Sequence, residues 1–98
     1  MQEQTHVEGQ RLIVEGEFRL LGVAGDPAVV QFISKSPTGR VVEINFPASD
    51  LTRVDLGLYE ALVTADEPGT WYFRWEGSGG IEAVRELSAY VTPSKVIH

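Results

Sequence analysis

The candidate side chains for acid–base or nucleophilic chemistry are the two histidines, His6 and His98, and a serine such as Ser49. His6 and His98 lie near opposite ends of the sequence, and neither has a second ligand at the short spacing that a metal site requires. Ser49 could act as a nucleophile only beside a base, and the expected strand order brings no histidine to it. The sequence has no cysteine, which excludes disulfides and thiolate metal ligands. We therefore expect no enzyme activity, no metal and no cofactor.

The glycine-rich run Gly77–Gly80 resembles a phosphate-binding loop in composition. A phosphate loop continues into Gly-Lys-Ser/Thr and a helix, whereas this run continues into a segment with the alternation of a strand. The run is therefore interpreted as a hairpin tip. Acidic residues at 50–55 and 66–67 could offer oxygen atoms to Ca²⁺, but isolated loop acids usually face water, and we predict no calcium site.

Aromatic residues between positions 59 and 75 could form either a sugar-stacking platform or a core. Trp71, Phe73 and Trp75 alternate with other residues, so they share one face of a strand, as is typical of a buried core. Tyr72, and after it Trp75, remain as candidates for surface contacts. The predicted structural core consists of Tyr59, Val63, Pro68, Gly69, Trp71, Phe73 and Trp75.

The segments that must position these side chains are short and separated by turn signals. Turn signals occur at residues 25–27, 37–39, 47–50, 66–69 and 77–80. Strands are predicted at residues 5–8, 11–23 with a bend at Gly16, 28–36, 41–46, 58–64, 70–76 and 82–92. Short strands at this spacing predict an all-β fold, an immunoglobulin-like antiparallel β-sandwich of about seven strands, with almost no helix.

Alternation within these segments predicts which side chains face the core. The inward sets are Val30, Phe32 and Ser34; Tyr59, Ala61 and Val63; and Ala83, Arg85, Leu87, Ala89 and Val91. Pro68 and Gly69 are expected to form the corner that leads into the strand of Trp71, because proline fixes φ and glycine permits a tight turn.

Length and charge set further limits. The 98 residues are expected to form one domain, with residues 1–10 as a flexible or docking arm and residues 94–98 as a loose tail. The net charge of −6 repels nucleic-acid phosphates and anionic lipids, so neither nucleic acid nor membrane is an expected partner. The first residues lack the basic and apolar regions of a secretion signal, and the chain is expected to be used without export.

The most distinctive stretch, Gly57 to Gly79, reads G-L-Y-E-A-L-V-T-A-D-E-P-G-T-W-Y-F-R-W-E-G-S-G. It resembles a signature of small Ig-like accessory and structural proteins of tailed-bacteriophage virions. In that signature a G-x-Y strand leads through a D-x-P-G-x-W corner into a W-Y-x-R-W-E-G strand. A weaker similarity covers residues 25–39, and residues 88–94 fit the last strand of this family.

The resemblance implies a non-catalytic virion structural protein, made in the host cytoplasm. Such a protein would serve as capsid decoration or as a neck-region accessory protein docked on a repeating lattice. Its partners would be phage capsid or neck and tail proteins, and further copies of itself on the particle. The residues leave open an Ig-like cell-surface adhesion or carbohydrate-binding module from a longer secreted protein. The candidate docking residues are Gln4, Val7, Gly77, Ser78, Gly79 and Gly80.

Overall fold

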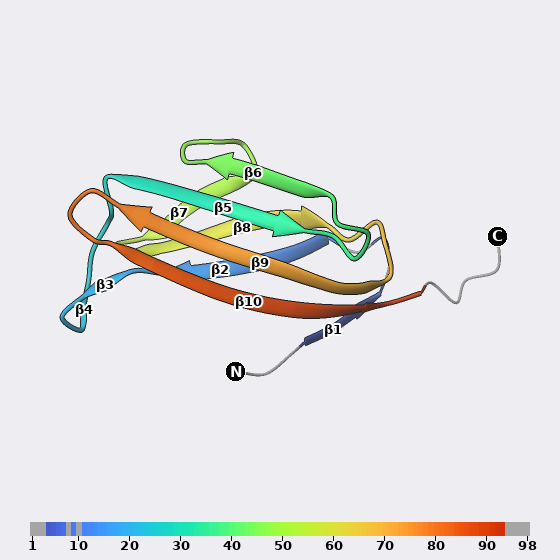
Figure 1. Cartoon of the computed structure of the whole chain (residues 1–98). Helices are drawn as coiled ribbons and strands as arrows, with labels where there is room; N and C mark the ends of the chain where they lie inside the picture. The colour runs from blue at the N-terminus through green and yellow to red at the C-terminus, as the bar shows by residue number, and fades with distance from the viewer. Residues whose placement is uncertain (1–3, 8, 10, 94–98) are drawn as a thin grey trace.

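The computed structural model describes the backbone of residues 4–7 and the complete residues 9 and 11–93. These residues form ten β-strands, and none of them forms a helix long and apolar enough to cross a membrane (Figure 1). The strands are β1 (Gln4–Val7), β2 (Arg11–Glu17), β3 (Arg19–Leu20), β4 (Val23–Ala24), β5 (Val29–Lys35), β6 (Val41–Asn45), β7 (Leu51–Asp55), β8 (Leu58–Thr64), β9 (Gly69–Ser78) and β10 (Ala83–Thr92).

Two sheets stack face to face, which confirms the predicted all-β sandwich. One sheet has five strands in the order β1-β10-β9-β5-β6, and the other has three in the order β2-β8-β7 (Figure 1). Every pairing in them is antiparallel except that of β1 with β10. The orders β10-β9-β5 and β2-β8-β7 are compatible with the two sheets of an immunoglobulin domain.

The core lies between the inner faces of the two sheets and follows the alternation in the sequence. Trp71, Phe73 and Trp75 of β9 are buried, and so are their counterparts on β5 and β8. The Trp75 ring is fully buried, with the Phe32 ring centroid 4.7 Å away. Large rings from both sheets therefore fill the centre, which is where such side chains contribute most apolar burial.

The predicted single strand over residues 11–23 is wrong. β2 ends at Glu17, and Phe18 then turns into the core, held by hydrogen bonds from its N–H to the Gly57 carbonyl (2.7 Å) and from the Gly25 N–H to its carbonyl (3.2 Å). The chain next forms a small hairpin, β3–β4, whose turn residues Leu21 and Gly22 have φ angles of 52° and 81°. The break is therefore at Phe18, and Gly16 lies within β2.

The N-terminal strand changes the interpretation of residues 1–10. Residues 4–7 pair in parallel with Ala89 to Thr92 of β10, so an edge strand forms close to the one predicted at residues 5–8, and this part of the segment is not a flexible arm. The pairing with β10 could not be predicted, because a parallel partner far along the chain leaves no local pattern in the sequence. The predicted tail, residues 94–98, lies outside the described residues.

Candidate docking site

The structure describes only some of the groups that were considered for catalysis or metal binding. Ser49 is exposed in the connection between β6 and β7, while His98 and the His6 side chain lie outside what the structure describes. Across the described residues, no group of three or more His, Asp or Glu side chains is placed to hold a metal ion. Tyr72 is 56% exposed, whereas Trp75 is buried, as expected of a core residue, so only Tyr72 remains a candidate for surface contacts.

Most of the predicted core residues are buried, and two are not. Tyr59, Val63, Trp71, Phe73 and Trp75 belong to the core. Pro68 is exposed and Gly69 is half-buried, because they form the corner between β8 and β9 and not the interior. Gly69 has φ of 123°, and a Cβ at this position would lie 2.8 Å from the Pro37 side chain. The corner therefore requires glycine for its backbone conformation and for its contact with the β5–β6 turn.

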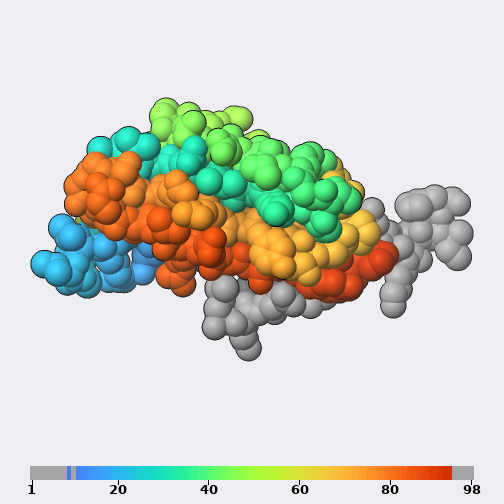
Figure 2. All heavy atoms as spheres, in the orientation of Figure 1, coloured from blue at the N-terminus to red at the C-terminus, as the bar shows by residue number. Residues whose placement is uncertain are grey.

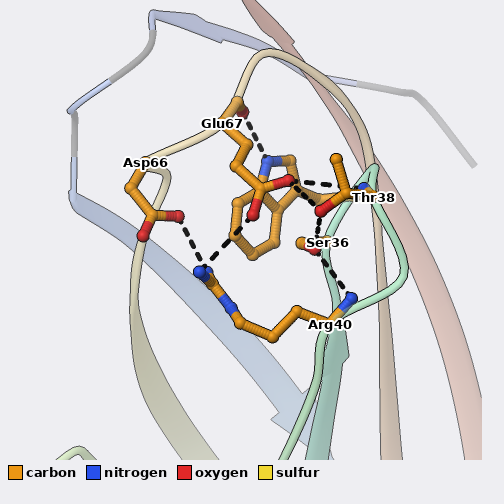
Figure 3. Close-up of polar contacts among 6 residues, drawn as sticks. Ser36, Thr38, Arg40, Asp66 and Glu67 are labelled. Carbon is orange, nitrogen blue, oxygen red and sulfur yellow. Dashed lines mark hydrogen bonds and ion pairs between the residues drawn. The ribbon is translucent and has the colours of Figure 1, made fainter.

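Polar contacts fasten this corner to the β5–β6 turn at one end of the sandwich (Figure 3). The Arg40 guanidinium donates to Asp66 at 2.8 Å and pairs with the Glu67 carboxylate at 3.4 Å. The Thr38 hydroxyl donates to Glu67 at 2.6 Å, and the Trp71 indole N–H donates to the Glu67 carbonyl at 2.9 Å. The Arg40 guanidinium also lies 5.9 Å from the Trp71 ring centroid.

The charged groups of this cluster interact with one another across the corner. The hydrogen bond from Arg40 holds the pKa of Asp66 below its usual range, and the same contact raises the pKa of Arg40. Each charged group has its counter-charge within the chain, as Figure 3 shows. The cluster therefore stabilises the corner, where one arginine is shared by two carboxylates.

A second polar cluster lies at the opposite end of the sandwich, around Asp26. One carboxylate oxygen accepts from the Gly57 N–H at 2.7 Å and from the Tyr59 hydroxyl at 3.2 Å, and the other accepts from Arg53 at 2.9 Å. These hydrogen bonds, that from Gly57 above all, lower the pKa of Asp26, while burial raises the pKa of Tyr59. This carboxylate joins the segment before β5 to the β7–β8 turn, and its role is structural.

The glycine-rich run is only in part a hairpin tip. Gly77 and Ser78 belong to β9, and Gly77 is buried, with a Cβ there meeting Pro27 at 2.7 Å and Phe18 at 2.8 Å. Gly77 and Ser78 also line a depression on the outer face of the five-stranded sheet, so both stay candidate docking residues. The Gly79 carbonyl accepts from the Ala28 N–H at 3.0 Å, and Gly80 remains exposed with positive φ. The backbone of the other two candidates, Gln4 and Val7, pairs with β10, and their side chains are not among those that the structure describes.

The surface feature that the sequence analysis missed is the β3–β4 tip, residues Leu20 to Val23. Leu20, Leu21 and Val23 are 54%, 96% and 68% exposed. In Figure 2 this hairpin, blue at the left, projects beyond the body of the molecule. The only sign of a turn in the sequence is the glycine that follows two leucines. This sign is weak, because an apolar run of this length favours a buried strand more than an exposed turn.

A depression of about 500 Å³ lies on the outer face of the five-stranded sheet, near the β9–β10 turn. Its lining includes Val29, Gln31, Asn45, Glu76, Glu82 and Val84. Val29 and Val84 are among the exposed apolar side chains. The depression thus combines apolar side chains with carboxylates, while the β3–β4 tip is a protruding apolar surface.

The chain matches no protein-family model, and no curated protein matches it.

Proposed function

We propose that this chain is a non-catalytic structural protein of a tailed-bacteriophage virion, acting as capsid decoration or as a neck-region accessory protein. The resemblance of Gly57–Gly79 to the signature of such proteins carries this proposal. In support, this stretch forms the two inner strands β8 and β9 together with the corner at Gly69. The motif therefore coincides with the part of the chain that builds the core.

Binding is the mode of action that follows from this proposal. Docking of many copies on a repeating lattice lets a modest interface on each copy suffice, because simultaneous contacts raise the overall affinity. The exposed apolar side chains of the β3–β4 tip and the free edge of β6 supply surfaces for such contacts. Both surfaces lie away from the buried motif.

The test uses particles of the source phage from which accessory proteins have been stripped. Purified protein is added, and the particles are pelleted over a range of protein concentrations. We expect saturable co-sedimentation, and an electron-microscopy map of the loaded particles should show sandwich-shaped density at repeated sites. A protein that stays in the supernatant at every concentration contradicts the proposal.

A carbohydrate-binding module is a second candidate, favoured by the placement of two tyrosines. Tyr72 on β9 and Tyr90 on β10 are exposed on the same outer face, and because Tyr72 pairs with Ser88, Tyr90 is its diagonal neighbour. Diagonal neighbours are about 7–8 Å apart, within reach of aromatic side chains that stack on a sugar. Titration of the tyrosine and tryptophan fluorescence with a glycan panel tests this candidate, and a Tyr72→Ala variant should abolish any response.

A further inference from the structure

Strand β6 (Val41–Asn45) ends the five-stranded sheet and is exposed on both of its faces. Val41 on the outer face is 54% exposed, and Val42 on the inner face is 43% exposed, while Ile44 packs against the core. Phe46, which directly follows the strand, is 37% exposed. β6 therefore leaves apolar side chains beside its edge that a further strand could cover, and covering them is favourable.

The other strands that end a sheet are less suited to a further strand. β2 already buries the side chains of its inner face, so an added strand would cover no apolar side chain there. The register of β7 shifts between Arg53 and Asp55, and such an irregularity disfavours pairing at an edge. β1 has only four residues. Among the described strands, β6 thus combines a regular edge with exposed apolar side chains on its inner face.

The backbone groups that point away from the sheet at β6 belong to Val41, Glu43 and Asn45. The Phe46 N–H donates to the Val30 carbonyl at 2.9 Å, so the even-numbered residues of this strand bond to β5. Bonded and non-bonded residues alternate along an antiparallel pair, which turns the N–H and C=O groups of the odd-numbered residues outward. Within the described residues, no strand pairs with this side of β6. A row of outward N–H and C=O groups is what an extended chain binds.

The charge of β6 indicates which strand fits its edge. Glu43, at the centre, is exposed and forms no ion pair with another described residue. A second copy of β6 would place Glu43 opposite Glu43 in the register that pairs all three outward residues, and two chains of net charge −6 repel each other. A cation opposite Glu43 instead forms a favourable cross-strand pair. The residues on either side of that cation fall on the inner face beside Val42 and Ile44, where apolar side chains fit.

We propose that the edge of β6 binds an extended segment of a partner protein as an additional strand, and that this segment carries a lysine or arginine between two apolar residues. The outward backbone groups of β6 supply the hydrogen bonds, and the partner's cation lies opposite Glu43. This inference deepens the proposed docking role, on which it rests for the source of the segment, and it names the surface used and the chemistry that this surface recognises.

The test uses the purified full chain and the peptide Ac-Thr-Val-Lys-Val-Thr-NH2, whose symmetric sequence presents the same side chains in either direction. An NMR titration gives the dissociation constant. At a peptide concentration of about ten times this constant, amide hydrogen exchange at Val41, Glu43 and Asn45 should slow by about tenfold, because only the free edge exchanges. The amides of Val42 and Ile44, on the side of β6 that bonds to β5, are the internal reference and should change less.

A second peptide and three variants separate the edge from the charge. The peptide with glutamate in place of lysine should bind about threefold more weakly or worse, the scale of a cross-strand charge pair. Glu43→Pro removes an outward N–H where the edge of a sheet tolerates proline, and should abolish binding of both peptides. Glu43→Gln keeps the edge and should bind the two peptides equally. Glu15→Gln, at an exposed glutamate of β2, is the matched control and should keep the preference for lysine.

Three results would overturn the proposal. The lysine peptide could leave exchange at the outward amides of β6 unchanged up to its solubility limit. The glutamate peptide could bind as tightly as the lysine peptide, so that charge plays no part. The chain could associate with itself in sedimentation velocity and lose this association in Glu43→Pro, in which case a second copy covers the edge. Phage particles do not enter this test, so its failure leaves co-sedimentation with particles untouched, and a failure of co-sedimentation leaves peptide binding untouched.

Discussion

Trp71 combines apolar burial with a hydrogen bond at a corner of the sandwich. It is 2% exposed, and its indole N–H donates to the Glu67 carbonyl at 2.9 Å. Trp71→Ala should lower the free energy of unfolding by about 3–5 kcal/mol, the range for truncation of large buried aromatic residues. A domain of this size has about 5–15 kcal/mol of stability in total, so the variant should be close to unfolding.

Urea denaturation of Trp71→Ala and of Tyr72→Ala measures this effect. Tyr72 is the next residue of β9 but points to solvent, so its truncation should cost no more than about 1 kcal/mol, the scale of an exposed strand position. Equal losses in the two variants would mean that the inner face of β9 has been assigned incorrectly.

Gly16 is required because a tryptophan ring occupies the space where a side chain would lie. A Cβ built on Gly16 would come within 2.4–2.7 Å of three atoms of the Trp75 indole. Trp75 cannot move aside easily, since rings of Phe18, Phe32 and Tyr59 surround it. Gly16→Ala should therefore destabilise the fold by about 1–3 kcal/mol, as overpacking of a core usually does.

Thermal melting compares Gly16→Ala with Glu15→Ala in the same strand. Glu15 is exposed directly opposite Glu60 on β8, so removal of one of two like charges should leave the melting temperature unchanged or raise it. A Gly16→Ala variant as stable as the parent would show that the indole can shift without cost.

At the scale of elements, carboxylates join loop segments that no hydrogen bonds between paired strands connect. Asp26 connects the segment before β5 with Arg53 on β7 and with the β7–β8 turn. Its pKa is lowered from the usual value of 3.8, because the ionised form accepts hydrogen bonds from Gly57, Arg53 and Tyr59. A lowered pKa in the folded state adds stability above the unfolded pKa, and this stability is lost as pH falls through the folded pKa.

Asp26→Asn should reduce this acid dependence. At pH 7 the variant should melt at a lower temperature than the parent, because the amide lacks the charge that Arg53 meets. The difference should shrink as the pH is lowered below 3.8 and Asp26 of the parent becomes protonated. Melting curves from pH 7 to pH 2 measure it, with Glu43→Gln on the exposed edge strand β6 as the control. Parallel curves for the parent and Asp26→Asn would contradict the assigned role.

At the scale of the whole molecule, the net charge of −6 governs encounters with other polyanions. Six of the eight basic residues are arginines at positions 11, 19, 40, 53, 74 and 85, and several of them already pair with carboxylates. Few cations remain to neutralise phosphates, so the chain should not bind duplex DNA at physiological salt. Fluorescence anisotropy of a labelled duplex checks this, and a salt-sensitive micromolar affinity would contradict it.

Local patterns predicted the inner faces of the sheets well. Alternation in β5, β8 and β9 identified the buried side chains, because a strand with one face in the core must alternate apolar and exposed positions. The same reasoning failed between residues 18 and 24, where Phe18, Leu20 and Val23 look like one apolar strand. The chain reverses there because Phe18 is drawn into the core beside Tyr59, a contact between residues far apart in sequence.

The sequence by itself therefore determined the all-β class, the two-sheet core and the glycine corner at Gly69, since these follow from period and from backbone preferences. Only the tertiary structure decided that Gly77 is buried, that residues 4–7 lie beside β10, and that Leu21 is exposed at a projecting turn. Each of these depends on which distant residues occupy the neighbouring space. The periodicity of a sequence does not contain this information, because it indicates which side of a strand a residue faces but not which distant residues it contacts on that side.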